Sequence, residues 1–224
     1  MTDDRPTDFQ RARSAEQRQA RKDAILKAAA ELLAEMPVRE ISLRELSRRV
    51  GLSKTNVVRY FETREAVFFE LLNRTFDQWL RELPGDLAAA APTAPASPGA
   101  VVDALARSLA RRPLLCDLFS SLGTELERNI SSEAARVFKV ENIDLQARLA
   151  NMLRRHATAL TQPAARELVG LLIVVTAGLW PFANPSPQVV EALEDPRLAH
   201  TQVDFADRLS RALRIAVTGL LNLD

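Results

Sequence analysis

The residue types best suited to specific recognition lie together in the stretch SKTNVVRY, residues 53–60. An arginine side chain can bridge O6 and N7 of guanine, an asparagine can bridge N6 and N7 of adenine, and a threonine methyl group can touch thymine. Arg59, Asn56 and Thr55 offer these interactions side by side. The chemistry that this stretch predicts is therefore the reading of base-pair edges, in which no bond is made or broken.

Residues for covalent chemistry are sparse elsewhere. The two histidines, His156 and His200, lie far apart and have no obvious carboxylate or thiol partner pattern. The single cysteine, Cys116, cannot form an intrachain disulfide and fits a reducing compartment. We interpret it as a small buried hydrophobe, with redox sensing as the alternative. Because the sequence has no metal-ligand spacing, P-loop or dinucleotide-binding glycine motif, we expect no enzyme activity, no metal and no cofactor.

The charge distribution suggests an anionic partner for the first quarter of the chain. The net charge is only +1, yet residues 11–64 hold thirteen lysines and arginines against seven acidic residues. Such a basic segment on a mildly acidic body suits binding to a polyanion. A solvated charged surface would explain the same excess equally well.

Two short helices are predicted to present the recognition stretch. Residues 42–45, SLRE, form a capping box in which Ser42 accepts a hydrogen bond from a backbone amide and Glu45 reaches back. Gly51 stands where the first helix needs a left-handed residue to end, and Ser53 can cap the second helix. Each helix spans about two turns and is too short to be stable alone. The tight turn between them predicts a helix-turn-helix.

A helical wheel sorts the second helix into a buried side and an exposed side. With Val57 turned inward, Thr55 and Arg59 point outward, and Asn56 and Val58 lie on the flanks. We therefore expect base contacts from Thr55, Asn56, Val58 and Arg59. Phosphate contacts, which position a helix without reading sequence, are expected from Ser42, Arg44, Ser53, Lys54, Tyr60 and Arg64. The alternative is a plain polar helix face in a bundle.

Composition and periodicity predict an all-α protein, since helix formers dominate and no alternating strand segment appears. We expect a helix-turn-helix domain at 14–64, opened by a capping box at Ser14, then a connecting helix at 65–83 capped by Thr63. A Pro/Ala-rich linker or loop is expected at 84–100. The domain at 101–224 should contain helices at 101–111, 114–127, 132–157, 163–180, 187–194 and 203–221.

The sequence is not expected to enter a membrane. The first ten residues, MTDDRPTDFQ, lack the apolar core of a signal peptide. The longest apolar run, residues 168–180, is shorter than the roughly 18 residues that a spanning helix needs, and Pro181 should end that helix. We therefore expect a soluble, cytoplasmic protein in which this run is buried.

The segment ISLRELSRRVGLSKTNVVRYFETREAVFFELL, within residues 20–72, closely resembles the DNA-binding segment of TetR-family transcriptional regulators. The shared pattern is a capped helix, a glycine turn, a recognition helix and a basic residue opening the next helix. The chain departs from it at Val58, where the family often has an aromatic residue that meets the DNA backbone, and at Ser47, where alanine is common. Val58 could instead touch a thymine methyl group.

The resemblance implies a homodimer whose three-helix N-terminal domain binds double-stranded DNA and whose C-terminal helical bundle dimerises and binds a small-molecule effector. We therefore predict a sequence-specific transcriptional regulator, a repressor that its effector releases from a palindromic operator. One alternative is a transcriptional activator. The other is an effector-binding or protein-interaction module that has lost operator recognition, for which Val58 is the sequence support.

Two sets of apolar residues follow from this resemblance in the C-terminal domain. The candidates for an effector pocket are Phe119, Leu122, Phe138, Met152 and Trp180, although large apolar residues are more often core. The candidates for a dimer interface are Leu171, Val174, Phe205, Leu209, Leu213 and Val217. An intramolecular core fits the spacing of the last helix equally well.

Overall fold

The computed structural model describes residues 8–90, 96–128 and 130–222. Within these ranges the chain forms α-helices and short 3-10 helices, and no β-strand occurs there. The chain divides into two compact units, Met1–Leu71 (unit 1) and Leu72–Asp224 (unit 2), and the division falls inside one long helix. The all-α prediction is confirmed.

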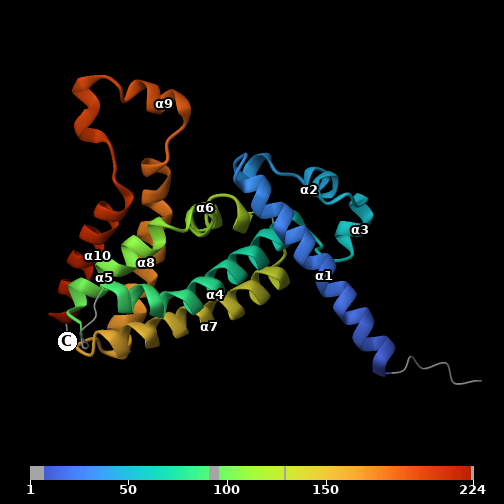
Figure 1. Ribbon diagram of the computed structural model, residues 1–224, viewed down its shortest axis with the longest axis horizontal. Helices are drawn as coiled ribbons and strands as arrows, with labels where there is room; N and C mark the ends of the chain where they lie inside the picture. The colour runs from blue at the N-terminus through green and yellow to red at the C-terminus, as the bar shows by residue number, and fades with distance from the viewer. Residues whose placement is uncertain (1–7, 91–95, 129, 223–224) are drawn as a thin grey trace, which may run out of the picture. The chain divides into compact units, whose positions relative to one another are not determined.

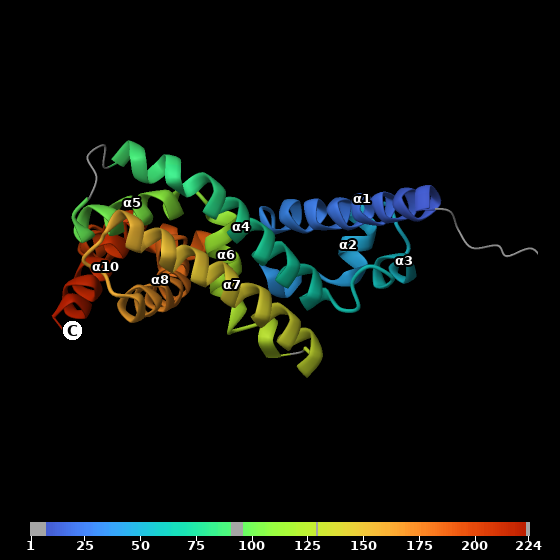
Figure 2. The same cartoon turned by 90° about the horizontal axis from the view of Figure 1, so that it is seen from below.

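Unit 1 is a small helical domain built around the first helix. Its elements are α1 (Asp8–Leu33), the 3-10 helix η1 (Val38–Glu40), α2 (Leu43–Val50), α3 (Lys54–Val58) and the beginning of α4 (Arg64–Ala90). Helices α2 and α3 lie along one side of α1, with α3 beside its N-terminal half (Figure 2). The fully buried side chains that hold the unit together include Ile25, Leu32, Ile41, Leu46, Val57 and Phe68.

The predicted start of the first helix at Ser14 is wrong, because α1 begins at Asp8. The residues between Asp8 and Ser14 contain no glycine or proline, so nothing in them stops the helix from extending toward the N-terminus. The prediction that Thr63 caps α4 is confirmed, since its Oγ1 accepts a hydrogen bond from the amide of Ala66 at 3.1 Å.

Unit 2 contains the rest of α4 and a bundle arranged around α8. Its other elements are α5 (Pro98–Ala110), α6 (Pro113–Leu122), η2 (Leu126–Arg128), α7 (Ser132–His156), α8 (Gln162–Ala183), α9 (Pro187–Ala192), η3 (Pro196–Thr201) and α10 (Phe205–Leu221). Helix α8 packs against α6, α7 and α10, and α10 also packs against α5. Figure 1 shows α9 within the long connection from α8 to α10.

The predicted linker at 84–100 is largely wrong, because α4 continues through Pro84 to Ala90 and α5 begins at Pro98. Residues 91–95 of the predicted linker lie outside the described residues. A proline inside a helix costs roughly 3 kcal/mol. That cost is offset here because Leu83 and Leu87, one turn apart on α4, are both buried, and a fully buried leucine contributes about 1.5–3 kcal/mol.

The prediction that Pro181 ends its helix is also wrong, since α8 runs to Ala183. Pro181 has no N–H to donate to the residue four positions before it, but α8 ends only two residues later, so one hydrogen bond is lost near the end of the helix. By length and composition α8 is the one described helix that could cross a membrane. Core helices of soluble proteins share these properties, so a single such helix is weak support for a membrane span.

Candidate functional site

The first helix of the predicted helix-turn-helix is capped at both ends. The side-chain oxygen of Ser42 accepts a hydrogen bond from the amide of Glu45 at 3.1 Å, as predicted. Gly51 ends α2 in the left-handed region, with φ 73° and ψ 29°. The next amide, that of Leu52, donates to the carbonyl of Ser47 at 3.0 Å. This hydrogen bond and the left-handed glycine form a Schellman motif, which turns the chain sharply after α2.

The second half of the predicted capping box is not formed. The carboxylate of Glu45 does not reach back to the amide of Ser42 but pairs with the guanidinium of Arg48 at 2.5 Å. This hydrogen bond from Arg48 lowers the pKa of the Glu45 carboxyl. A long carboxylate beside an arginine one turn away on the same helix face forms the ion pair, because the charged partner is the stronger donor.

The recognition helix α3 is shorter than the two turns predicted. It spans only Lys54–Val58, capped by Ser53, whose Oγ accepts from the amide of Asn56 at 3.2 Å. The amides of Tyr60 and Phe61 both donate to the carbonyl of Val57, at 2.9 and 3.0 Å, so the chain keeps winding beyond α3. The Val57 side chain is fully buried and anchors the helix.

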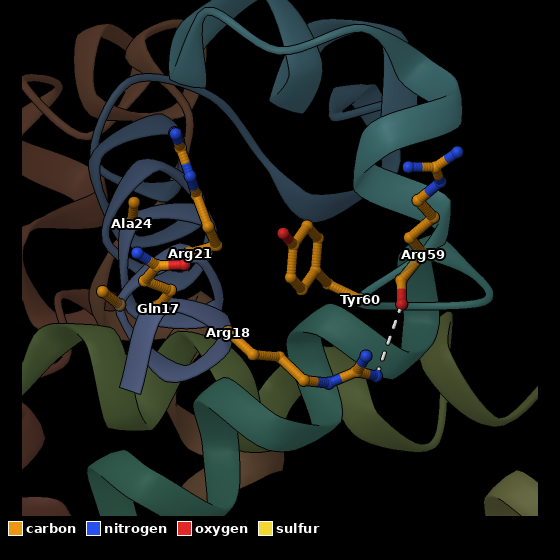
Figure 3. Close-up of a pocket in the computed structure, with 7 residues that line it drawn as sticks. Gln17, Arg18, Arg21, Ala24, Arg59 and Tyr60 are labelled. Carbon is orange, nitrogen blue, oxygen red and sulfur yellow. Dashed lines mark hydrogen bonds between the residues drawn. The ribbon is translucent and has the colours of Figure 1, made fainter. Parts of the chain in front are cut away.

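The base-contact candidates all lie on the solvent side of α3. Thr55, Asn56 and Arg59 are exposed, and Val58 is 41% exposed. Since Val57 is buried between these positions, the helix turns this face outward as the wheel predicted. Figure 3 shows that the Arg59 side chain points away from α1. Base contact by these residues stays a prediction, supported by their exposure.

The phosphate-contact candidates differ in their exposure and in the hydrogen bonds and ion pairs that they already make within the chain. Arg44 and Lys54 are exposed and make no ion pair with a described residue. Ser42 and Ser53 accept capping hydrogen bonds, which leaves each hydroxyl proton available for a phosphate oxygen. Tyr60 is half-buried. Their contacts with phosphate stay predictions.

Arg64 is turned into unit 1. Its guanidinium pairs with Glu65 at 2.8 Å and donates to the backbone carbonyls of Val38 and Ile41, both at 3.3 Å. These bonds tie the beginning of α4 to the segment that leads into α2. Arg64 therefore stabilises the packing of unit 1. Phosphate contact by its side chain stays a prediction.

Sequence reasoning missed a hollow on the surface of unit 1, which we call the arginine hollow. It has a volume of about 740 Å³, and the residues that line it are Gln17, Arg18, Ala20, Arg21, Ala24, Arg59 and Tyr60. The guanidinium of Arg18 donates to the backbone carbonyl of Arg59 at 3.4 Å and lies 5.7 Å from the centre of the Tyr60 ring. Figure 3 shows the Tyr60 ring pointing toward α1.

A signal for the arginine hollow was present in the sequence. Arg18 and Arg21 lie seven and four positions before Ile25, which is fully buried. On a helix these spacings place all three side chains on one face. The basic residues therefore continue the buried stripe of α1 toward the N-terminus.

The effector candidates in unit 2 lie in packed surroundings. Leu122 is half-buried, and the other candidates, Phe119, Phe138, Met152 and Trp180, are buried. Phe119 meets Phe76 of α4 edge to face, with ring centroids 5.5 Å apart. These contacts agree with the core role that the sequence left open for such residues.

Trp180 joins three helices of unit 2. Its ring meets Phe205 of α10 edge to face at 4.8 Å, and its indole N–H donates to Oδ1 of Asp117 on α6 at 2.6 Å. Burial raises the pKa of the Asp117 carboxyl, although the indole hydrogen bond acts against this. The contacts hold the end of α8 between its neighbours.

The dimer-interface candidates divide into two groups. The candidates on α10, which are Phe205, Leu209, Leu213 and Val217, are buried within this single chain. On α8, Leu171 is half-buried and Val174 is 68% exposed. The α10 residues therefore fill the intramolecular core, the alternative that their spacing left open.

Both parts of the chain match families of known sequences. Residues 25–71 match the family described as bacterial regulatory proteins, tetR family, and residues 73–222 match the tetracyclin repressor-like, C-terminal domain. The HTH-type transcriptional regulator RutR of Escherichia coli K12 is 34% identical over 64 residues, which cover 29% of this chain and 30% of that protein. The match thus spans less than a third of this relative's length.

Solved structures share the fold. A TetR transcriptional regulator from Rhodococcus sp. RHA1 has a TM-score of 0.55 at 20% identity, covering 90% of this chain and 97% of that chain. The fatty acid degradation regulator FadR from Bacillus halodurans has a TM-score of 0.55 at 14% identity, covering 88% and 98%. At these identities the likeness shows the fold alone.

Proposed function

This chain belongs to the TetR family of DNA-binding transcriptional regulators, and we propose that it is a homodimeric repressor that a small molecule releases from a palindromic operator. The observation that carries the proposal is the exposed face of α3, with Thr55, Asn56 and Arg59 held outward by two serine caps, the Gly51 turn and buried Val57. Rigid presentation lowers the entropy lost when side chains engage bases.

The two α3 helices of a dimer would enter successive major grooves, about 34–36 Å apart. In this arrangement Thr55, Asn56, Val58 and Arg59 read bases, while Arg44 and Lys54 hold phosphates. We place the protein in the cytoplasm and assign it no enzymatic activity. Support for these assignments comes from its family and from the polar chemistry of α3.

The first test is selection from a random duplex library, followed by titration of the selected duplex. Arg59→Ala should cost about 1–3 kcal/mol and relax the preference at one base position, because an arginine that bridges guanine is lost. Lys54→Ala is the matched control; it should weaken all sequences alike and reduce the salt dependence. If Arg59→Ala behaves like Lys54→Ala, Arg59 does not read a base. If no palindrome is enriched, the operator proposal fails.

For the dimer we propose an interface on the outer side of α8 and α10. Val174 and Phe182 on α8 are 68% and 73% exposed, and Ile215 on α10 is 69% exposed. Exposed apolar residues on two packed helices mark an interaction surface, and a second copy of the chain would cover them. This replaces the buried residues of α10 that the sequence suggested.

Sedimentation velocity tests this interface. Val174→Glu should shift the chain from dimer to monomer, because a carboxylate buried without a partner is costly. The control is Val190→Glu on α9, a site 51% exposed, where the dimer should persist. A Val174→Glu chain that stays dimeric would contradict the interface.

We propose that the effector binds unit 2. The hollow of about 340 Å³ between α7 and α8, lined by Ile143, Gln146, Ala147, Arg166 and Val169, supports this role because it combines apolar walls with an amide and a guanidinium. An effector shifts the dimer only by its differential affinity for the two states. Compounds that raise the melting temperature should therefore also release the selected duplex in an anisotropy assay; stabilisation without release would contradict the repressor mechanism.

A further inference from the structure

One face of α1 is apolar in its C-terminal half and basic toward its N-terminus. In the C-terminal half, Ile25, Ala29 and Leu32 are fully buried and pack into the core of unit 1. Toward the N-terminus the same stripe carries Arg21 and Arg18, both exposed. Because residues three or four apart share a helix face, the apolar side of α1 becomes the basic wall of the arginine hollow.

The arginine hollow has no carboxylate among its described lining residues, whereas several other basic side chains of unit 1 are paired with one. Elsewhere in the unit Lys22 pairs with Glu70 at 3.1 Å and Arg49 pairs with Glu35 at 2.5 Å, as Arg48 and Arg64 pair with their own glutamates. In contrast, Arg18, Arg21 and Arg59 form no ion pair with a described residue, and none of the described residues lining the hollow is acidic.

Three arginines line the hollow and none of its described lining residues is acidic, so this surface carries an excess of positive charge. Arg18 is held in place by its hydrogen bond to the carbonyl of Arg59 and by the face of the Tyr60 ring. A fixed cation loses less entropy when it binds an anion than a free side chain does. The hollow is thus suited to an anion that comes from outside the chain.

We propose that the arginine hollow binds the sugar-phosphate backbone of the DNA strand beside the major groove that α3 enters, with Arg18 and Arg21 as its phosphate ligands. The proposal rests on the proposed function. Arg59 and Tyr60 line the hollow and also follow directly on α3, so a strand read by α3 brings its phosphates to this surface. Guanidinium groups bind phosphate oxygens in pairs of charge-assisted hydrogen bonds, and the Tyr60 hydroxyl can donate another.

Arg21→Ala is the variant that tests the site most cleanly, because Arg21 makes no hydrogen bond or ion pair with a described residue. Its affinity for the selected duplex should be measured from 50 to 200 mM salt. Each lost phosphate contact lowers the slope of log K against log salt by about 0.9, so a dimer should lose about 1.8. The preference for the selected sequence over a scrambled duplex should not change.

The matched control is Arg39→Ala. Arg39 carries the same charge but lies in η1, beyond the far end of α1, and its side chain is 69% exposed beside Glu40. Fifteen residues of helix, roughly 22 Å, separate Arg18 from that end of α1. Arg39→Ala should leave the slope unchanged. Equal salt slopes for Arg21→Ala and Arg39→Ala would refute a phosphate contact in the arginine hollow, because the loss of affinity would then follow from net charge alone.

Neutral methylphosphonates placed one at a time along the duplex locate the contact. At the contacted phosphate, the substitution should weaken binding of the unsubstituted chain and have no further effect on Arg21→Ala. Additive losses at every position would overturn the site.

A free anion is the other source of the same chemistry. Inorganic pyrophosphate should not raise the melting temperature of the DNA-free protein through Arg21; a rise that Arg21→Ala abolishes, together with an unchanged salt slope, would overturn the DNA assignment. Failure of the unsubstituted chain to select any duplex would refute the proposed function itself. If the chain binds selectively but Arg21→Ala leaves the slope of log K against log salt unchanged, only the binding of phosphate by the arginine hollow would be refuted.

Discussion

Replacing Gly51 by alanine should destabilise the chain through its backbone conformation. Gly51 has φ 73° and ψ 29°, in the left-handed region. A Cβ atom added to it would meet no atom within 4 Å. The cost of alanine at this turn therefore comes from the backbone alone, with no contribution from a steric clash.

The size of the effect follows from two opposing terms. A left-handed L-residue costs roughly 1–2 kcal/mol, and the lower entropy of the unfolded chain with alanine offsets about 0.4–1 kcal/mol. The free energy of unfolding should fall by about 1 kcal/mol, or roughly 2–4 °C in Tm for a chain of this size. Gly51→Asn should cost less than alanine, because asparagine tolerates this region.

Gly85 supplies the matched control. It lies within helix α4 at a φ that suits any residue, and an added Cβ would again meet nothing within 4 Å. Here Gly85→Ala should stabilise the chain by about 1 kcal/mol, the helix propensity difference. The same chemical change should thus have opposite signs at the two positions.

Urea unfolding followed by far-UV circular dichroism measures the difference. Both tryptophans, Trp79 and Trp180, lie in unit 2, so their fluorescence would miss unit 1. Protein concentration must be held constant, because the stability of the proposed dimer would depend on it. If Gly51→Ala stabilised the chain as much as Gly85→Ala, the left-handed turn between α2 and α3 would be refuted.

Two further predictions concern unit 2. Burial opposes ionisation of Asp103, but hydrogen bonds from Arg214 and Ser210 outweigh it and hold the pKa of its carboxyl below the usual value. The ionised Asp103 therefore contributes to the free energy of unfolding above about pH 4. That contribution is lost as the pH falls through the folded-state pKa. Asp103→Asn should therefore flatten the dependence of the unfolding free energy on pH in acid, and an unchanged dependence would contradict the Asp103–Arg214 pair. Cys116 is fully buried and burial raises the pKa of its thiol, so a thiol reagent should label it only in urea; rapid labelling of the folded chain would instead support a redox role.

The local features of the DNA-binding unit could be predicted from the sequence. Ser42, Gly51, Ser53 and Thr63 take the cap and turn positions expected of them, because a cap depends on hydrogen bonds between residues a few positions apart. The outward face of α3 followed in the same way once Val57 was placed in the core. Even here the Glu45 side chain was misplaced, since Arg48 competed for it.

Features that depend on packing between helices were decided by the tertiary structure. Helix α4 passes through Pro84 because burial of Leu83 and Leu87 offsets the cost of the proline, and burial depends on packing that local propensity does not record. The periodicity of α10 was the same for a core and for an interface, and burial of Leu213 within one chain decided between them.

The arginine hollow required both kinds of information. Sequence alone determined that Arg18 and Arg21 share a face of α1 with Ile25, because helical spacing is a local property. Only the fold brought that face to Arg59 and Tyr60, which are about forty positions away in the chain. A helical period determines which residues of one helix lie together, whereas the packing of helices determines what they meet.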